Sequence, residues 1–142
     1  PMNIEDNWIL DRIDNHCELA YQPQTMEDGQ GNTPVYLTIK RDQIIFKTKS
    51  NIDLAYEETG VTVDDGDQLA IEKLSNEYSI SYEQGHQNLL AQMMTGKRAT
   101  LTLGFWPTWP ISQTYALEFN LKGLPSAHQS LTDCFTLENE LK

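Results

Sequence analysis

Two cysteines, Cys17 near the start of the chain and Cys134 near its end, are the residues whose chemistry the sequence marks most clearly. Only one intrachain pairing is open to them, and it would close most of the chain into a ring. In the chain-entropy view, so long a loop stabilises the folded state by about 4 to 5 kcal/mol. We therefore expect a Cys17–Cys134 disulfide and an oxidising compartment, with two separate buried thiols as the alternative.

Catalysis or metal binding by these cysteines is disfavoured by what surrounds them. Neither has a lysine or arginine beside it to stabilise a thiolate, and the neighbouring Glu18 and Asp133 disfavour that charge. There is no CxxC or paired-histidine spacing that would form a zinc site. His16, His86 and His128 are scattered, and no nucleophile motif accompanies them. We expect no enzyme activity, no catalytic residue, no metal and no cofactor.

A second chemical signal is the segment 106–110, which has the most unusual composition in the chain. Trp106 and Trp109 are held by Pro107 and Pro110 between two expected strands. Tryptophans bury a large area with little loss of side-chain entropy, so this stiff apolar loop is the first candidate for a contact surface that stacks on a sugar or docks a peptide. The alternative is that one or both rings fold back to close the end of the core.

Acidic loops are the third candidate, at Glu57, Glu58, Asp64, Asp65 and Asp67. The calcium-loop spacing D-x-[DN]-x-[DN]-G is absent from them, which favours solvated turns over a metal site. The whole chain has 21 acidic and 10 basic residues, a net charge of −11. This charge disfavours nucleic acid and anionic lipid, and a charge-matched protein partner would be basic. Alternatively, the acidity simply keeps a small protein soluble.

The elements that must position these residues are mainly short strands separated by turns. Strands are expected at residues 8–13, 17–21, 35–40, 43–48, 52–56, 61–63, 68–74, 78–82, 98–105 and 114–121, and a long polar loop at 22–33. Two helices are expected at about 84–95 and 124–134. This order favours an antiparallel β-sandwich or partly open barrel capped by the helices. Residues 1–142 are expected to form a single domain with a loose C-terminal tail from about 136.

The compartment is constrained only weakly by the remaining sequence. The apolar runs are too short to cross a bilayer, so membrane insertion is not expected. Residues 1–6 have neither the cationic start nor the apolar stretch of a signal peptide, and both a mature secreted protein and a cytosolic one fit such a start.

The chain resembles the invasion-associated locus B proteins, a bacterial periplasmic or secreted family. The resemblance lies in Trp8 ahead of Cys17, and in a helix followed by residues 96–99, a strand, residues 115–124 and a last helix with Cys134. It covers about the last fifty residues plus Trp8 and Cys17. It departs from the family at Pro125 and Ser126 and in the tryptophan–proline segment. The resemblance implies a sandwich-like fold, no assigned catalytic residues and a role in host association.

Two functions follow as expectations. The first is a periplasmic or secreted module for binding or host association, locked by its disulfide and contacting a protein partner through loops at one end. The alternative is a small acidic inhibitor or immunity-type protein, cytoplasmic or periplasmic, that neutralises a basic toxin or enzyme through the five acidic residues named above.

Overall fold

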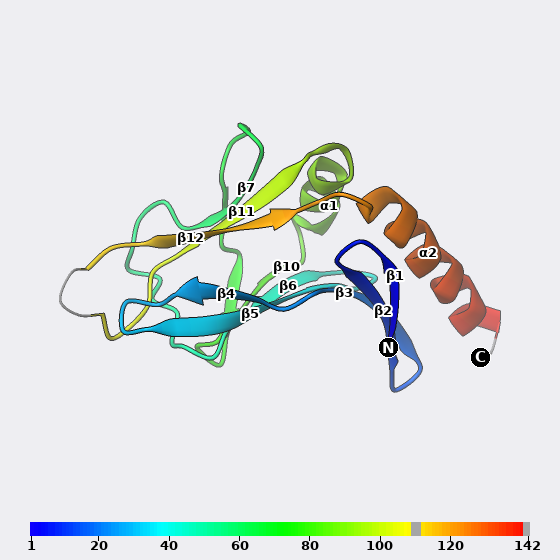
Figure 1. Cartoon of the computed structure of the whole chain (residues 1–142), viewed down its shortest axis with the longest axis horizontal. Coiled ribbons are helices and arrows are strands. Elements are labelled where there is room, and N and C mark those ends of the chain that lie inside the picture. Colours follow the sequence, from blue (N-terminus) through cyan, green and yellow to red (C-terminus); the bar gives the residue numbers. More distant parts are fainter. Residues whose placement is uncertain (109–111, 141–142) are drawn as a thin grey trace.

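The computed structural model describes residues 1–108 and 112–140, and Figure 1 shows two β layers with a long helix at one end. The elements are β1 (Met2–Glu5), β2 (Trp8–Ile13), β3 (His16–Tyr21), β4 (Gln24–Glu27), β5 (Asn32–Ile39), β6 (Ile44–Lys47), β7 (Gly60–Val63), β8 (Leu69–Ala70), β9 (Lys73–Ser75), β10 (Ser79–Tyr82), α1 (His86–Thr95), β11 (Arg98–Leu103), β12 (Tyr115–Asn120) and α2 (Leu124–Glu140). The expected mainly β chain with two helices is confirmed.

The strands form two antiparallel sheets. The larger sheet has eight strands in the order β1-β2-β3-β5-β6-β10-β9, with β4 also paired to β5. The smaller sheet has four strands in the order β12-β11-β7-β8. Figure 1 shows the smaller sheet lying over the part of the larger one that contains β4, β5, β6 and β10. The sheets do not close on each other, so the fold is layered and is not a closed barrel.

Alternation of apolar residues explains the best-formed strands. In β5, Val35, Leu37 and Ile39 are buried, whereas the residues between them are partly exposed. In β11 the same pattern buries Ala99, Leu101 and Leu103. Because successive side chains point to opposite faces of a strand, each sheet gives one apolar face to the space between the layers. These faces meet in one contiguous core.

The β2–β3 hairpin turns at Asp14 and Asn15, between the two strands expected there. Both residues have positive φ, at 51° and 65°, and the strands pair directly beyond them, Ile13 opposite His16. Two-residue hairpins favour such turns because their twist matches that of the strands, and aspartate and asparagine tolerate the left-handed backbone.

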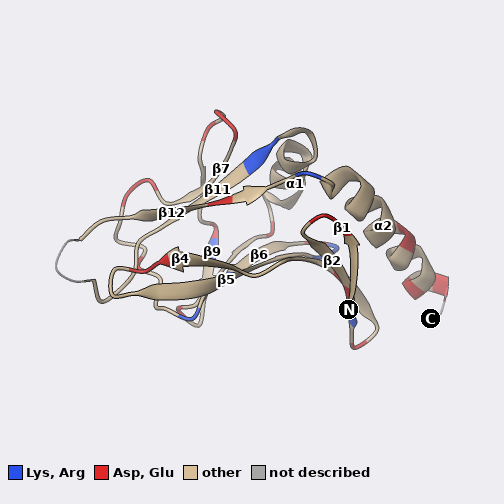
Figure 2. Cartoon of the chain, in the orientation of Figure 1, with Lys and Arg blue, Asp and Glu red and all other residues tan. Residues whose placement is uncertain are grey.

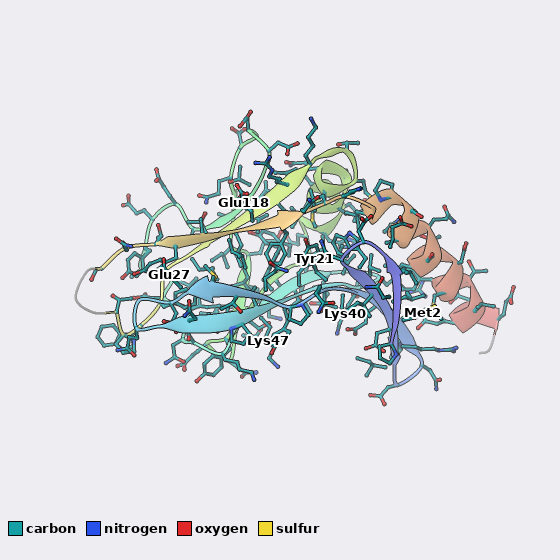
Figure 3. The ribbon with its side chains drawn as sticks, viewed as in Figure 1. Met2, Tyr21, Glu27, Lys40, Lys47 and Glu118 are labelled. Atoms are coloured by element: carbon teal, nitrogen blue, oxygen red, sulfur yellow. A yellow bond between two sulfur atoms is a disulfide. The ribbon has the colours of Figure 1, made fainter. Side chains whose placement is uncertain are left out.

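The rings of Trp8, Tyr21 and Phe119 form an aromatic cluster that joins the two layers near α2. Tyr21 of β3 meets Trp8 and Phe119 edge to face, with ring centroids 4.9 Å and 5.1 Å away. Its hydroxyl accepts hydrogen bonds from the Asn7 side chain and from the backbone N–H of Asn120 in β12, both at 3.1 Å. Figure 3 shows Tyr21 between the layers. The aromatic cluster therefore fixes the edge strand β12 over the larger sheet.

Helix α1 begins and ends close to where the sequence indicates. Its apolar stripe buries Leu89 and Met93, and the helix ends at Gly96, whose N–H donates to the carbonyl of Gln92. A side chain at Gly96 would collide with Val63, so the close approach of helix and strand requires glycine. Before the helix, the carboxylate of Glu72 accepts three backbone N–H bonds, from residues 83 to 85, and so anchors the turn that leads into α1.

Helix α2 is longer than expected, and the loose tail from about residue 136 was a wrong prediction. The helix continues to Glu140 along the inward face that contains Ala127 and Leu131. Glu138 extends this face, and its side chain is only 5% exposed because it is bonded to other parts of the chain. A buried and fully bonded carboxylate thus holds the last turns in place of an apolar residue.

Three further sequence predictions need correction. The loop expected at 22–33 contains β4 and the first residues of β5, where Met26 is buried and pairs with Thr33. The strand expected at 52–56 reduces to one bridge, between Ile52 and Phe105. Residues 2–5, for which the sequence predicts no strand, form β1 against β2. The strands β1 and β4 are held by their partner strands and have little alternation of their own, so the sequence pattern does not reveal them.

Candidate functional site

The candidate site lies around Trp106, in the connection that follows β11. Trp106 is 67% exposed, whereas Phe105 beside it is buried. The backbone of this connection is fixed against residues 51–53. The N–H of Trp106 donates to the carbonyl of Asn51 at 2.9 Å, and the N–H of Asp53 donates to the carbonyl of Gly104 at 2.9 Å. An exposed ring is thus carried on an ordered backbone.

Thr108 anchors the connection on its other side. It packs against Gly29, where a side chain would collide with it and where φ is +90°, so this contact requires glycine. Its hydroxyl also lies 3.3 Å from that of Tyr56. Tyr56 in turn covers Gly104 so closely that a side chain there would collide with its ring. The loops at residues 28–31 and 50–56 therefore hold Trp106 between them.

Asp28 organises the first of these loops. One of its oxygens accepts the N–H groups of Gln30 and Gly31, at 2.9 Å and 2.7 Å, and the other accepts the hydroxyl of Ser50 at 2.6 Å. Burial alone acts to raise the pKa of Asp28, but the hydrogen bonds from Ser50, Gln30 and Gly31 outweigh it and lower the pKa below its usual value. Asp28 is therefore a charged group at neutral pH.

Trp106 lines two hollows. The smaller, of about 190 Å³, is lined by Asp28, Gln30, Ser50, Asn51, Phe105, Trp106 and Pro107. The larger, of about 460 Å³, is lined by Asn51, Ile52, Asp53, Leu54, Leu74, Glu77 and Trp106. We call Asp28, Asn51, Asp53, Leu54, Glu77 and Trp106 the Trp106 surface. It combines an exposed ring and the 51%-exposed Leu54 with three carboxylates, and neither hollow has a lysine or arginine in its lining as described.

The sequence predicted part of this surface. Trp106 is exposed as a contact residue must be, and Pro107 lines the smaller hollow. Trp109 and Pro110 lie outside the described residues. No sequence motif indicated Asn51, Asp53, Leu54 or Glu77, which reach the surface from other loops. For Asn51, Asp53 and Leu54 the only local signal is that polar residues and one exposed leucine follow β6 without strand alternation, whereas Glu77 lies between β9 and β10.

The acidic candidates lie in two separate loops, both visible in red in Figure 2. Glu57 and Glu58 lie before β7, in a loop near the same end of the molecule as the β11–β12 connection, and Asp65 and Asp67 are exposed in the turn after β7. Asp64 has a structural role, because its carboxylate accepts the N–H groups of Lys97 and Arg98 at 3.0 Å. Within residues 1–108 and 112–140, no three acidic, histidine or cysteine side chains are grouped to hold a metal ion.

At the opposite end of the molecule, the expected disulfide between Cys17 and Cys134 is confirmed, and it joins β3 to α2 with Cα atoms 6.1 Å apart. Beside it, the carboxylate of Glu138 accepts the backbone N–H of Cys17 at 2.7 Å and the guanidinium of Arg41 at 2.8 Å. The same guanidinium lies 4.2 Å from the centre of the Phe135 ring. We call Cys17, Arg41, Cys134, Phe135 and Glu138 the clasp.

The three histidines are not assembled into a site. His16 lies at the clasp with its Nδ1 3.7 Å from Glu138. His86 and His128 belong to the packed helices α1 and α2. His86 is 8% exposed, and its Nε2 has no hydrogen-bond partner among the described residues. Burial lowers the pKa of His128, and the nearby His86 lowers it further.

Fold and surface together define a disulfide-linked domain of two antiparallel sheets with an exposed, acid-flanked tryptophan at one end. Comparison with protein-family models, with curated proteins and with solved structures finds no match to this chain. The resemblance to the invasion-associated locus B proteins therefore stays a prediction. Across the described part of the chain, no helix has both the length and the apolar character needed to cross a membrane.

Proposed function

We propose that this chain is a periplasmic or secreted binding module that contacts a protein partner through the Trp106 surface. The observation that carries the proposal is that Trp106 is 67% exposed on a backbone hydrogen-bonded to Asn51. Tryptophan is enriched at the centres of protein interfaces, and an ordered loop loses little conformational freedom on binding. A host-association role, as the resemblance implies, belongs to the same proposal.

The disulfide supports the compartment named in the proposal. Disulfides form and persist in oxidising environments and are rare in the reducing cytosol. Cys17 is only 3% exposed, so its bond to Cys134 belongs to the packed interior. If the protein works outside the cytoplasm, blocking free thiols in intact producing cells should leave both cysteines unmodified until a reductant is added to the denatured protein. Two thiols modified before reduction would contradict the proposed compartment.

Binding is tested by comparing wild type with Trp106→Ala. Extracellular or periplasmic proteins from the source are passed over each immobilised variant, and a protein retained by the wild type is purified and its affinity measured. Loss of an interface tryptophan should weaken binding about tenfold to a hundredfold. Leu137→Ala is the matched control, because Leu137 is also 53% exposed but lies on α2 at the other end. An unchanged affinity for Trp106→Ala would overturn the proposal.

A further inference from the structure

We propose that the Trp106 surface recognises an arginine in a basic, extended segment of the partner, with the guanidinium over the indole ring and beside the carboxylates. This inference rests on the proposed function and specifies what the same surface binds. It identifies the partner by its chemistry, as a protein segment with at least one accessible cationic side chain.

The first argument is the unpaired charge of the surface. Asp28, Asp53 and Glu77 line the two hollows beside Trp106. Among the ion pairs formed by the described residues, none involves these three carboxylates. The hydrogen bonds to Asp28 keep its pKa low, so that charge persists at neutral pH. Both hollows that Trp106 lines thus contain carboxylates, and no lysine or arginine is among their described lining residues.

The second argument comes from the clasp, where an aromatic ring and a carboxylate occur together with a cation bound to both. There the Arg41 guanidinium lies 4.2 Å from the centre of the Phe135 ring and donates a hydrogen bond of 2.8 Å to the Glu138 carboxylate. The chain therefore already contains an arginine held between a ring and a carboxylate. The Trp106 surface has the ring and the carboxylates, and tryptophan is the aromatic side chain that attracts a cation most strongly. A guanidinium completes the arrangement.

The third argument favours arginine over lysine and a peptide over a sugar. A guanidinium is planar, stacks on a ring and still donates several hydrogen bonds to carboxylates at its edge. The larger hollow also includes Leu54 and Leu74, which can cover the alkyl part of a long side chain. A neutral sugar would stack on Trp106 but would leave the charge of Asp53 and Glu77 without a counterpart, and it would bind independently of salt.

The test uses three capped hexapeptides of alternating glycine with arginine, lysine or citrulline as probes. Citrulline has the shape of arginine without its charge. Binding is followed by heteronuclear NMR of the isotopically labelled full chain, using the indole N–H signal of Trp106, which is assigned by its loss in Trp106→Leu. We expect the arginine peptide to shift this signal and to bind about threefold or more tightly than the lysine peptide and about tenfold or more tightly than the citrulline peptide. Raising NaCl from about 20 mM to about 300 mM should weaken the arginine peptide severalfold.

Two variants separate local recognition from net charge. The double variant Asp53→Asn/Glu77→Gln should bind the arginine peptide about three- to tenfold more weakly. Asp65→Asn/Asp67→Asn is the matched control, because it removes two exposed charges from the turn after β7 and should change the affinity less than about twofold. Trp106→Leu keeps an apolar side chain, and it should lose most of the preference for arginine over citrulline.

The outcomes distinguish this inference from the proposed function. Equal binding of the arginine and citrulline peptides, equal weakening by the two double variants, or a shift of the Trp106 signal by a neutral oligosaccharide without effect from the arginine peptide would each overturn the arginine assignment. None of these would affect the proposed function, which fails only if the purified partner binds Trp106→Ala as well as it binds the wild type.

Discussion

The carboxylate of Glu138 accepts the backbone N–H of Cys17 at 2.7 Å, although 121 residues separate the two in sequence. Glu138 lies four residues after Cys134, the partner of Cys17 in the disulfide, so both contacts come from one face of α2. A covalent bond and a charge-assisted hydrogen bond therefore connect the same strand residue to successive turns of the helix. This arrangement explains why α2 stays helical beyond Cys134.

Removing the Glu138 carboxylate should destabilise the fold. In Glu138→Ala the buried N–H of Cys17 and the guanidinium of Arg41 both lose their acceptor, which should lower the free energy of unfolding by about 2 to 3 kcal/mol. Glu138→Gln keeps one acceptor oxygen and should cost about 1 kcal/mol. Urea unfolding measures both. Glu140→Ala, an exposed carboxylate on the same turn, should change the value by less than about 0.5 kcal/mol. A similar loss in Glu140→Ala would contradict the assignment.

The same carboxylate should make the protein sensitive to acid. Burial acts to raise the pKa of Glu138, but the hydrogen bonds from Cys17 and Arg41 and the charge of Arg41 outweigh it and lower the pKa below 4.5. A group with a lowered native pKa contributes stability that is complete above its unfolded pKa and is lost as the pH falls through its native value. Stability should therefore fall below about pH 4.5, and less steeply in Glu138→Gln. Parallel pH profiles of the two proteins would refute this.

Replacing both cysteines should weaken the fold without abolishing it. The disulfide closes a loop across 117 positions of sequence, and its loss in Cys17→Ser/Cys134→Ser should cost about 3 to 5 kcal/mol. The core should still form, because the aromatic cluster and the Glu138 bonds do not depend on the sulfurs. Thermal unfolding followed by circular dichroism measures the loss. An unchanged midpoint would mean that the disulfide adds nothing to what these contacts provide.

The hydrogen bonds to the Tyr21 hydroxyl should help to hold the two sheets together. Tyr21→Phe keeps the ring against Trp8 and Phe119 but removes the acceptor for Asn7 and for the N–H of Asn120. The expected loss is about 1 to 2 kcal/mol in urea unfolding, with faster amide exchange at Asn120. Tyr36→Phe is the control, since no hydrogen bond from the Tyr36 hydroxyl occurs within the described residues. Exchange at Asn120 that stays as slow as in wild type would contradict this role.

Strands that bury one face could be predicted from the sequence, because their alternation is a local property. Val35, Leu37 and Ile39 predict β5 without knowledge of any partner. Glu138 could not be predicted in the same way. It occupies a position of α2 where apolar residues are expected, and its burial depends on Arg41, 97 residues earlier in the chain. The sequence alone therefore predicts a polar tail where the structure has a bonded helix.

The candidate site also combines a residue that the sequence could predict with residues that it could not. The tryptophan–proline composition predicted that Trp106 lies in a contact loop, since this signal is contained in five consecutive residues. Asp53, Leu54 and Glu77 reach the same surface because β11 continues into backbone bonds with residues 51–53, and because the N–H of Ile52 donates to the carbonyl of Glu77 at 2.7 Å. Such pairing across loops has no short-range signature, which is why the ring could be proposed from the sequence and its acidic surroundings could not.

The packing of α1 against α2 should make the free energy of unfolding depend on pH a second time, at higher pH than the effect of Glu138. His128 of α2 is half-buried, and both its burial and the nearby His86 lower its pKa below 6.5. In the unfolded chain His128 binds a proton near that value, so its contribution to stability is complete above about pH 6.5 and is lost as the pH falls through the lower native pKa. The free energy of unfolding should therefore decrease as the pH falls through the range below about 6.5, starting at higher pH than the loss due to Glu138. His128→Gln should flatten this decrease, as measured by urea unfolding at intervals across the range. A slope as steep in His128→Gln as in wild type would show that another group is responsible.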